Sequence, residues 1–253
     1  MTEVAPWRVI SIKVSHGCEL VRWLLERAGL PFYEDVHAPL LHVLATLLIR
    51  GGVEVPVIVT PNGVWAGLLN QINTIDAHAR WGYKIFGETE GERMTNAAFI
   101  TTIMPLFADA PRQYVYAAVL PNRQVMVPIA CAGAPLWERA FVTSLYPLWR
   151  ILISKGLKIN AKTLAAAPGR IHQLTDMVGA ELARRESPFL AGAAPGGVDV
   201  VIAALMAPLI FPPQYGGRLP PLDAVSPTLR AFILDIRARP AGDLALRTYA
   251  ACR

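Results

Sequence analysis

The stretch Gly51–Gly63, GGVEVPVIVTPNG, decides the fold. It holds a β-rich run, Val55–Thr60, with a proline at its second position, and it closes on Pro61-Asn62-Gly63. Proline has no N–H group and is accepted only at the start or the edge of a strand. Asn-Gly is a strong signal for a hairpin turn. The pattern therefore predicts two antiparallel strands, Val55–Thr60 and Val64–Ala66, with Pro56 where the first strand begins.

The residues around this hairpin predict an alternation of strands and helices. Runs of β-branched residues indicate strands, and apolar residues at helical spacing before a glycine indicate helices. The expected elements are strands at Trp7–Val14 and Pro31–Val36 and helices at Glu19–Ala28, Leu40–Arg50 and Leu68–Ala79. The order β-α-β-α-β-β-α describes a thioredoxin-like domain, in which the strand–helix–strand unit is parallel and right-handed. In such a domain Pro56 is expected to follow a cis bond, although an ordinary trans edge proline remains the simpler alternative.

The pattern changes after residue 82. A polar, Gly-rich segment that begins near Trp81 indicates a linker, and the remainder has helical periodicity with loops at Leu120–Pro135 and Phe211–Leu222. The expected helices are 95–118, 135–155, 161–185, 197–210 and 226–238. The predicted organisation is therefore a thioredoxin-like domain at 1–82, a linker at 83–94 and an all-helical domain at 95–253.

The composition is apolar, yet no membrane span is expected. Apolar residues make up 53% of the 253 residues and charged residues 17%. The most apolar run, Val198–Phe211, is interrupted by Asp199 and Pro208, and it is shorter than the roughly 20 apolar residues that span a bilayer. A buried core helix is the better interpretation. The first residues lack the pattern of a signal peptide.

Cysteines and charges exclude several classes of protein. Cys18, Cys131 and Cys252 are odd in number and far apart, which does not suggest a disulfide framework or a metal cluster. A reducing cytoplasm fits this usage. The net charge of +5 comes from scattered basic residues without a Lys/Arg run, so a nucleic-acid partner is not expected.

Four motifs, in this order and spacing, resemble the glutathione S-transferase superfamily. The first joins Ser15-His16-Gly17-Cys18 to a Val-Arg pair, and the second is Val55-Pro56 with its following strand. The third is Phe189-Leu190-Ala191-Gly192, followed by the entry to a buried helix at Asp199. The fourth is the tail from Arg239 to Tyr249. The resemblance implies a thioredoxin-like domain followed by an all-helical domain. It also implies that two copies of the chain form a cytoplasmic homodimer.

The resemblance also implies a site for glutathione as co-substrate. The backbone of Val55, before Pro56, would pair with the cysteinyl part of glutathione. Ser15 stands where serine-type members place the hydroxyl that stabilises the thiolate, although a serine there can simply cap the helix. Cys18 is the alternative reactive group because a thiol at a helix start can have a lowered pKa. It can equally be an inert core residue.

His16 has two interpretations, a proton carrier near the thiol or a solvent-exposed loop histidine, and the second is favoured. Arg22 is expected to form a structural ion pair with Glu26 or an inter-domain contact. Asp199 is expected to be structural, because it can reach back to the free N–H at the start of its helix.

The sequence departs from the family at the start of the third helix. The acidic residue and serine that hold the γ-glutamyl end fall on Leu68 and Leu69, with Asn70 and Gln71 as possible substitutes. A hydrogen bond to a charged group contributes roughly 1.5–3 kcal/mol. Losing two such bonds would weaken glutathione binding by about 3–6 kcal/mol.

Two functions follow from this resemblance, and the apolar content alone suggests a third, use of the fold at a membrane, which the lack of a span contradicts. The first is a glutathione transferase-like enzyme for detoxification, which adds the glutathione thiolate to an apolar electrophile. The acceptor pocket would lie against the helical domain, at Met104, Phe107, Tyr114 and Tyr116. The alternative is a non-catalytic protein of the same fold that binds an apolar ligand or a protein partner. The type of reaction and the second substrate stay open.

Overall fold

The hairpin around Pro56 forms one side of a four-stranded sheet in the computed structural model, which describes residues 5–80 and 82–253. The strands are β1 (Trp7–Ser11), β2 (Phe32–Val36), β3 (Val57–Thr60) and β4 (Gly63–Ala66), in the order β2-β1-β3-β4. β1 and β2 are parallel, whereas β1 with β3 and β3 with β4 are antiparallel. The bond between Val55 and Pro56 is cis. The predicted hairpin is confirmed, and of the two states that the sequence left open for Pro56 the structure has the cis one.

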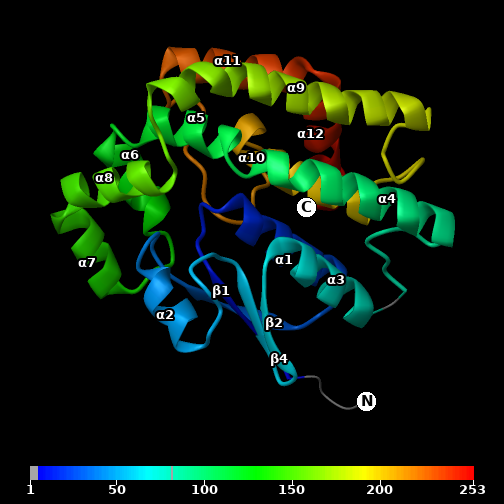
Figure 1. Ribbon diagram of the computed structural model, residues 1–253, viewed down its shortest axis with the longest axis horizontal. Helices are drawn as coiled ribbons and strands as arrows, with labels where there is room; N and C mark the ends of the chain where they lie inside the picture. The colour runs from blue at the N-terminus through cyan, green and yellow to red at the C-terminus, as the bar shows by residue number, and fades with distance from the viewer. Residues whose placement is uncertain (1–4, 81) are drawn as a thin grey trace.

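Three helices accompany the sheet: α1 (His16–Arg27), α2 (His42–Leu48) and α3 (Leu68–His78). α1 begins three residues earlier than predicted, because Ser15 caps it and its Oγ accepts the Cys18 N–H at 3.4 Å. The predicted first strand is correspondingly too long, since β1 ends at Ser11. α1 and α3 contact each other and lie between the sheet and the remaining helices (Figure 1).

The rest of the chain is helical, as predicted. Its elements are α4 (Glu90–Ile103), η1 (Met104–Phe107), α5 (Ala110–Val119), α6 (Arg123–Ala130), α7 (Leu136–Ser144), α8 (Tyr146–Gly156), α9 (Ala161–Arg185), α10 (Gly197–Ile210), α11 (Pro227–Ala238) and α12 (Pro240–Cys252). α10 is buried along its whole length and packs against α1, α11 and α12. None of the helices in the described ranges has the length and apolar character needed to cross a bilayer. The fold class, a thioredoxin-like sheet domain with an all-helical partner, is confirmed.

Prolines explain two helices that were predicted as single units. The segment 95–118 is divided at Met104–Phe107, because Pro105 and Pro111 each begin a new helical segment. The segment 135–155 is divided at Leu145, two residues before Pro147. Proline lacks the N–H that would continue the hydrogen-bonded ladder, so it is accepted in a first turn.

Two helices were not predicted. Leu120–Pro135 was expected to be an irregular loop, yet it contains α6, which Asn122 caps by accepting the Val125 N–H at 3.2 Å. Its single internal proline, Pro128, lies near the end of the helix. The tail after Arg239 forms α12, with Pro240 at its first position.

The predicted linker at 83–94 is packed rather than loose. Ile85 and Phe86 are buried, and the Ile85 N–H donates to Asp76 Oδ1 at 2.7 Å. The last part of the segment already belongs to α4, which starts with a reciprocal capping box between Thr89 and Glu92. Trp81, the expected first residue of the linker, lies outside the described residues.

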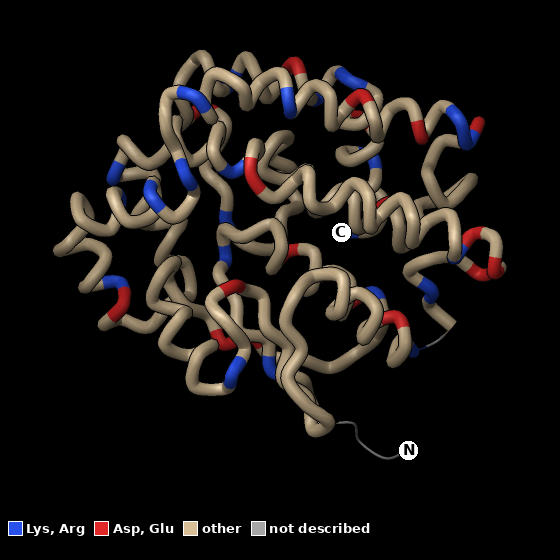
Figure 2. Tube along the Cα trace, viewed as in Figure 1, with Lys and Arg blue, Asp and Glu red and all other residues tan. Residues whose placement is uncertain are grey.

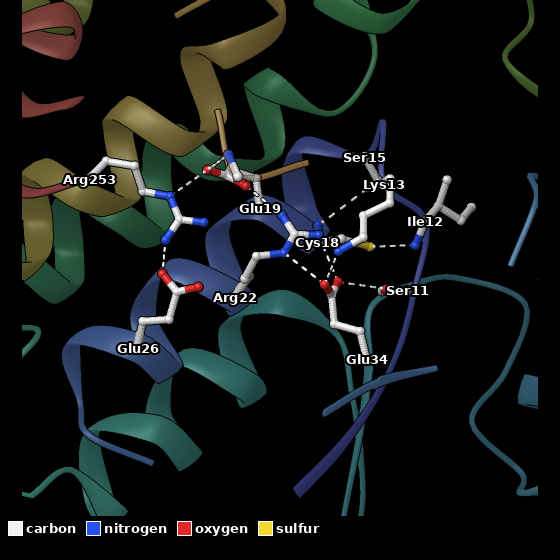
Figure 3. A network of polar contacts seen from close by, with 11 residues as sticks. Ser11, Ile12, Lys13, Ser15, Cys18, Glu19, Arg22, Glu26, Glu34 and Arg253 are labelled. Atoms are coloured by element: carbon white, nitrogen blue, oxygen red, sulfur yellow. Dashed lines mark hydrogen bonds and ion pairs between the residues drawn. The ribbon is translucent and has the colours of Figure 1, made fainter. Parts of the chain in front are cut away.

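A buried ionic network connects α1 with β2 and with the end of the chain (Figure 3). Arg22 pairs with Glu19 at 2.5 Å and with Glu34 at 2.7 Å, so its role is structural as expected but its partner is not Glu26. Glu19 also pairs with Arg253 at 3.1 Å and accepts the Gly216 N–H at 3.0 Å. Glu26 pairs with Arg253 instead.

Candidate functional site

A cavity of about 360 Å³ opens where the sheet meets the helical layer. The loop after β1, the residues before β3 and the first residue of α3 line it from one side. η1, α5, α6, α8 and α10 line it from the other side. Most lining residues are apolar, and the polar ones are Ser15, His16, His42, Glu54, Arg112 and Tyr116. The cavity can therefore hold an apolar molecule that presents a reactive group to a small polar end.

Ser15 lies at that polar end. It is half-buried, and its hydroxyl caps α1 while also lining the cavity. The cap is therefore present, and the role at a thiol stays a prediction. The N-terminus of a helix favours negative charge, so an anionic atom in front of Ser15 would be stabilised by α1.

His16 differs from the favoured expectation of an exposed loop histidine. It is the first residue of α1, is only 8% exposed and lines the cavity beside Ser15. Burial and, to a smaller extent, the Arg112 cation lower the pKa of His16 to about 3. The imidazole is therefore neutral at neutral pH, and it can donate or accept a hydrogen bond without carrying charge.

Val55 offers a free backbone edge beside the cis proline. It lines the cavity, and within the described residues neither its N–H nor its C=O has a backbone partner. An extended peptide could add to such an edge through main-chain hydrogen bonds, which do not depend on the side chain. Pro56 lies next to it, and its Cδ would be 3.4 Å from a methyl group placed on Gly17.

Leu68 brings an apolar side chain to this end of the cavity. It is the first residue of α3, and its two methyl groups would lie 3.5 Å from a Cβ on Gly17. Leu69 does not line the cavity and packs against the main core. Neither leucine side chain can accept a hydrogen bond from an ammonium group or donate one to a carboxylate.

Asn70 and Gln71 are not placed to substitute for the missing acidic residue and serine. Gln71 is fully buried, and its Nε2 donates to the carbonyl oxygens of Pro56 at 2.6 Å and Trp65 at 3.0 Å. It therefore holds the cis-proline loop against β4. Asn70 is exposed, and its Nδ2 donates to Ala66 O at 3.3 Å. Neither residue lines the cavity.

Cys18 lies one turn into α1, outside the cavity. It is 1% exposed, and its Sγ accepts the Ile12 N–H at 3.3 Å. Burial raises the pKa of the Cys18 thiol to about 11. These features favour the interpretation of an inert core cysteine and argue against a reactive role, which remains a prediction.

The helical wall contains two of the four residues expected there. Met104 and Tyr116 line the cavity, whereas Phe107 is fully buried in the core and Tyr114 packs on Phe232 with ring centroids 4.5 Å apart. Burial raises the pKa of Tyr116 to about 12, so its phenol is a neutral hydrogen-bonding group.

Arg112 is a cationic lining residue that the sequence did not identify. It lies on α5, and its guanidinium is 3.6 Å from the exposed carboxylate of Asp109. The only available signal was its helical spacing from Tyr116, four residues later on the same face of α5.

Many solved structures with a similar fold are glutathione S-transferases. Glutathione transferase F2 from Populus trichocarpa is 13% identical, with a TM-score of 0.59 over 97% of this chain and 99% of its own. A glutathione S-transferase from Methylobacterium radiotolerans in complex with glutathione sulfonate is 14% identical, with a TM-score of 0.55 over 96% and 95%. One from Rhodospirillum rubrum is 14% identical, with a TM-score of 0.52 over 95% and 91%. This chain has the glutathione S-transferase fold. No family model matches the sequence, and no curated protein does.

Within the glutathione S-transferase fold, the cavity combines familiar and unexpected parts. Ser15 and Val55 occupy the positions that the resemblance assigns to the thiol and to the peptide of glutathione. Leu68 occupies the position that the resemblance assigns to the acidic anchor. The fold is therefore shared, while the start of α3 departs from the pattern that the resemblance implies.

Proposed function

We propose that this protein is a glutathione transferase-like enzyme, which adds the thiolate of glutathione to an apolar electrophile. The observation that carries the proposal is one cavity in which Ser15, the free backbone of Val55 and an apolar wall meet. The glutathione part belongs to residues 1–82 and the acceptor pocket to residues 95–253, joined by the linker at 83–94. The proposal includes a homodimer that acts in the cytoplasm in detoxification.

The residues present fit glutathione at two of its three parts. The peptide would bind the N–H and C=O of Val55, and the thiol would face the Ser15 hydroxyl at the positive end of α1. Each unit by which the thiol pKa falls corresponds to about 1.4 kcal/mol in favour of the thiolate. The γ-glutamyl end does not fit, because the Leu68 side chain offers it no hydrogen bond. Weak glutathione binding is the expected consequence.

Each residue has a limited task in this proposal. Ser15 holds the sulfur by a hydrogen bond, and neutral His16 lies beside it as a second donor that adds no charge. The apolar wall positions the electrophile and excludes water from the sulfur. The thiolate then forms the new bond to carbon, and the electrophile either expels its leaving group as an anion or takes up a proton from water.

The apolar residue at the anchor position favours a second candidate. Leu68 lies close to Gly17, and it places an apolar side chain in the cavity beside Ser15. A protein that binds an apolar ligand without using glutathione would need no acidic anchor there. The two candidates differ in one measurable property, the affinity for glutathione.

Calorimetric titration with glutathione, together with turnover of a generic aryl halide, separates them. Three variants accompany the wild type: Ser15→Ala, Ser15→Asn and Ser226→Ala. Asn retains the capping function but removes the hydroxyl. Ser226 is a matched control because it caps α11 in the same way, with its Oγ accepting the Leu229 N–H at 3.3 Å, outside the cavity.

The expected result is millimolar binding of glutathione and aryl halide turnover in the wild type. Both Ser15 variants should then lose most of the turnover, about 10²-fold or more if the hydroxyl stabilises the thiolate, while Ser226→Ala keeps it. Absence of binding at several millimolar glutathione would refute the transferase and favour the apolar-ligand protein.

A further inference from the structure

The hairpin of α7 and α8 presents an apolar surface to solvent. We call it the α7–α8 face and define it by Leu136, Trp137 and Phe141 on α7 and Leu148, Ile151 and Leu152 on α8. These side chains are between 43% and 82% exposed. The other side of the hairpin is buried, since Val142, Trp149 and Ile153 belong to a hydrophobic core. The hairpin is therefore apolar on both sides, although only one side has a partner among the described residues.

The charges around this face have one sign. Between Asp109 and Asp176 the only acidic residue is Glu138, whereas the same stretch contains eight lysines and arginines. Glu138 is fully buried, where it accepts the Ala38 N–H at 2.6 Å and contacts His37 at 2.6 Å. The cations Arg139, Arg150, Lys155 and Lys158 are exposed. In Figure 2 this side of the molecule shows blue positions with a single red one in α7.

We propose that the α7–α8 face binds the surface of an anionic lipid bilayer. Several exposed apolar residues on two consecutive helices are typical of an interaction site. Helices that lie in the bilayer interface combine Trp, Phe and Leu with Lys and Arg, which is the composition found here. Anionic headgroups attract each nearby cation by about 1 kcal/mol. The face thus supplies both contributions that stable binding to a membrane surface requires.

A second copy of the chain fits this face less well. A two-fold interface brings the same surface of each copy together, so the cations Arg139, Arg150 and Lys155 of one copy would face a surface that carries the same cations. No carboxylate on the hairpin could compensate them, because Glu138 is buried and already paired. An anionic surface removes this repulsion, whereas a homodimer through the face would add to it.

The position of the hairpin connects the proposed membrane contact with the cavity. Ile153, Gly156 and Leu157, at the end of α8, line the cavity, while Leu148, Ile151 and Leu152 on the same helix face solvent. A bilayer bound at the α7–α8 face would therefore lie one helix away from an apolar cavity. Molecules dissolved in the bilayer would be enriched close to its wall. Lipid binding itself requires neither glutathione nor turnover.

Flotation of the full-length protein with vesicles tests the proposal. One set of vesicles mixes phosphatidylglycerol with phosphatidylcholine, and the other contains phosphatidylcholine alone. Three double variants are compared: Leu136→Ser with Leu148→Ser, Arg150→Glu with Lys155→Glu, and Met94→Ser with Leu234→Ser. The last pair is the matched control, because Met94 and Leu234 are 67% and 49% exposed on α4 and α11.

We expect the wild type to float with the anionic vesicles and much less with the neutral ones. Removing a cation should weaken partition about 5-fold, so the charge variant should lose at least 20-fold. The leucine variant should lose at least 10-fold, while the control pair changes partition less than 2-fold. Equal flotation with both lipids, no flotation of the wild type, or equal losses in the control would each overturn the proposal.

Trp137 supplies an independent measurement. Brominated phospholipids in anionic vesicles should quench wild-type tryptophan emission, and most of the quenching should disappear in Trp137→Phe, which still floats. Quenching that Trp137→Phe leaves unchanged would exclude the face as the contact. A shift from dimer to monomer in the leucine variant without vesicle binding would instead identify an interface between copies, and it would also refute the proposal.

Discussion

His16 and Cys18 flank Gly17 at the start of α1, and burial moves their pKa values in opposite directions. The pKa of His16 falls to about 3 and that of Cys18 rises to about 11. Both side chains are therefore neutral at neutral pH. The positive end of α1 thus remains available to an anion from outside the chain. Ser15, which caps α1 and lines the cavity, would be next to such an anion.

The lowered pKa of His16 predicts a loss of stability in acid. The unfolded chain protonates this histidine near its ordinary value of 6.5, whereas the folded protein keeps it neutral down to about 3. The stabilisation is complete above pH 6.5 and is lost as the pH falls toward 3. From pH 7 to pH 4 it should decrease by about 2–3 kcal/mol.

Urea unfolding at pH 7 and pH 4 of the wild type, His16→Gln and His78→Gln measures this effect. His16→Gln should lose about 2–3 kcal/mol less on acidification than the wild type. His78→Gln, which removes an exposed histidine of α3, should follow the wild type. Parallel losses in all three proteins would mean that His16 is not kept neutral by the fold.

The sequence predicts this part of the site unevenly. Ser15 and Val55 were identified because short motifs fix the loop after β1 and the cis proline. The burial of His16 was missed because it depends on tertiary packing, in which α5 lines the same cavity from a distant part of the chain. Arg112 was missed for the same reason. Local patterns determine which residues stand at a helix start, whereas tertiary packing determines what covers them.

At the scale of elements, the start of α3 is where the proposed glutathione site departs from the family pattern. Its N-terminus points into the cavity with Leu68 as the first residue, where a carboxylate would also interact favourably with the helix. If glutathione binds along Val55, then Leu68→Glu should raise its affinity about 10-fold or more, because a hydrogen bond to a charged group contributes roughly 1.5–3 kcal/mol.

Calorimetry with glutathione tests this gain against Asn70→Glu. Asn70 is exposed two residues further along α3 and does not line the cavity, so its substitution adds the same charge without the proposed contact. An equal increase in both variants would indicate a general charge effect. No increase in Leu68→Glu would contradict the binding mode along Val55.

α10 depends on a single carboxylate at its first turn. Asp199 is fully buried and accepts the N–H groups of Leu190 at 2.7 Å, Ala191 at 3.1 Å and Gly196 at 2.9 Å. This confirms the structural role predicted from its spacing. Asp199→Ala should lower the free energy of unfolding by about 3–5 kcal/mol, because one buried and two partly buried N–H groups lose their acceptor.

Chemical denaturation measures this loss, with Asp243→Ala as the control. Asp243 occupies the first turn of α12 and pairs with Arg247 at 2.8 Å, but it is 61% exposed. Its removal should change stability by less than about 1 kcal/mol. Similar losses of unfolding free energy in the two variants would show that Asp199 stabilises the start of α10 no more than an exposed first-turn carboxylate does.

Element boundaries were predictable where capping chemistry was visible. α9 and α10 have the predicted limits. The Thr89–Glu92 box also follows a recognisable spacing, and it could have placed the start of α4 correctly. α6 could not be recognised with similar ease, because Pro128 inside it is a helix-breaking signal that tertiary contacts of Met126 and Ile129 override.

At the scale of the whole molecule, Glu19 links parts of the chain that are far apart in sequence. It lies on α1, pairs with Arg22 and Arg253, and accepts the Gly216 N–H. The same region contains the bond from Trp23 Nε1 to Cys252 O at 3.0 Å and the bond from the Arg218 N–H to Lys13 O at 3.0 Å. These contacts fix the sheet domain to the helical layer, so the two should unfold together.

Glu19→Gln tests this coupling because it leaves the buried cations without their shared carboxylate. Breaking a buried ion pair in this way costs about 3–5 kcal/mol.

Glu26→Gln is the control, since Glu26 also pairs with Arg253 but is 43% exposed, and its substitution should cost less than about 1 kcal/mol. Far-UV circular dichroism and tryptophan fluorescence should give coincident transitions in the wild type. In Glu19→Gln the midpoint should fall while the two probes still coincide. Separate transitions in the wild type would mean that the two parts unfold independently. Equal losses of stability in Glu19→Gln and Glu26→Gln would mean that Glu19 contributes no more to the coupling than Glu26.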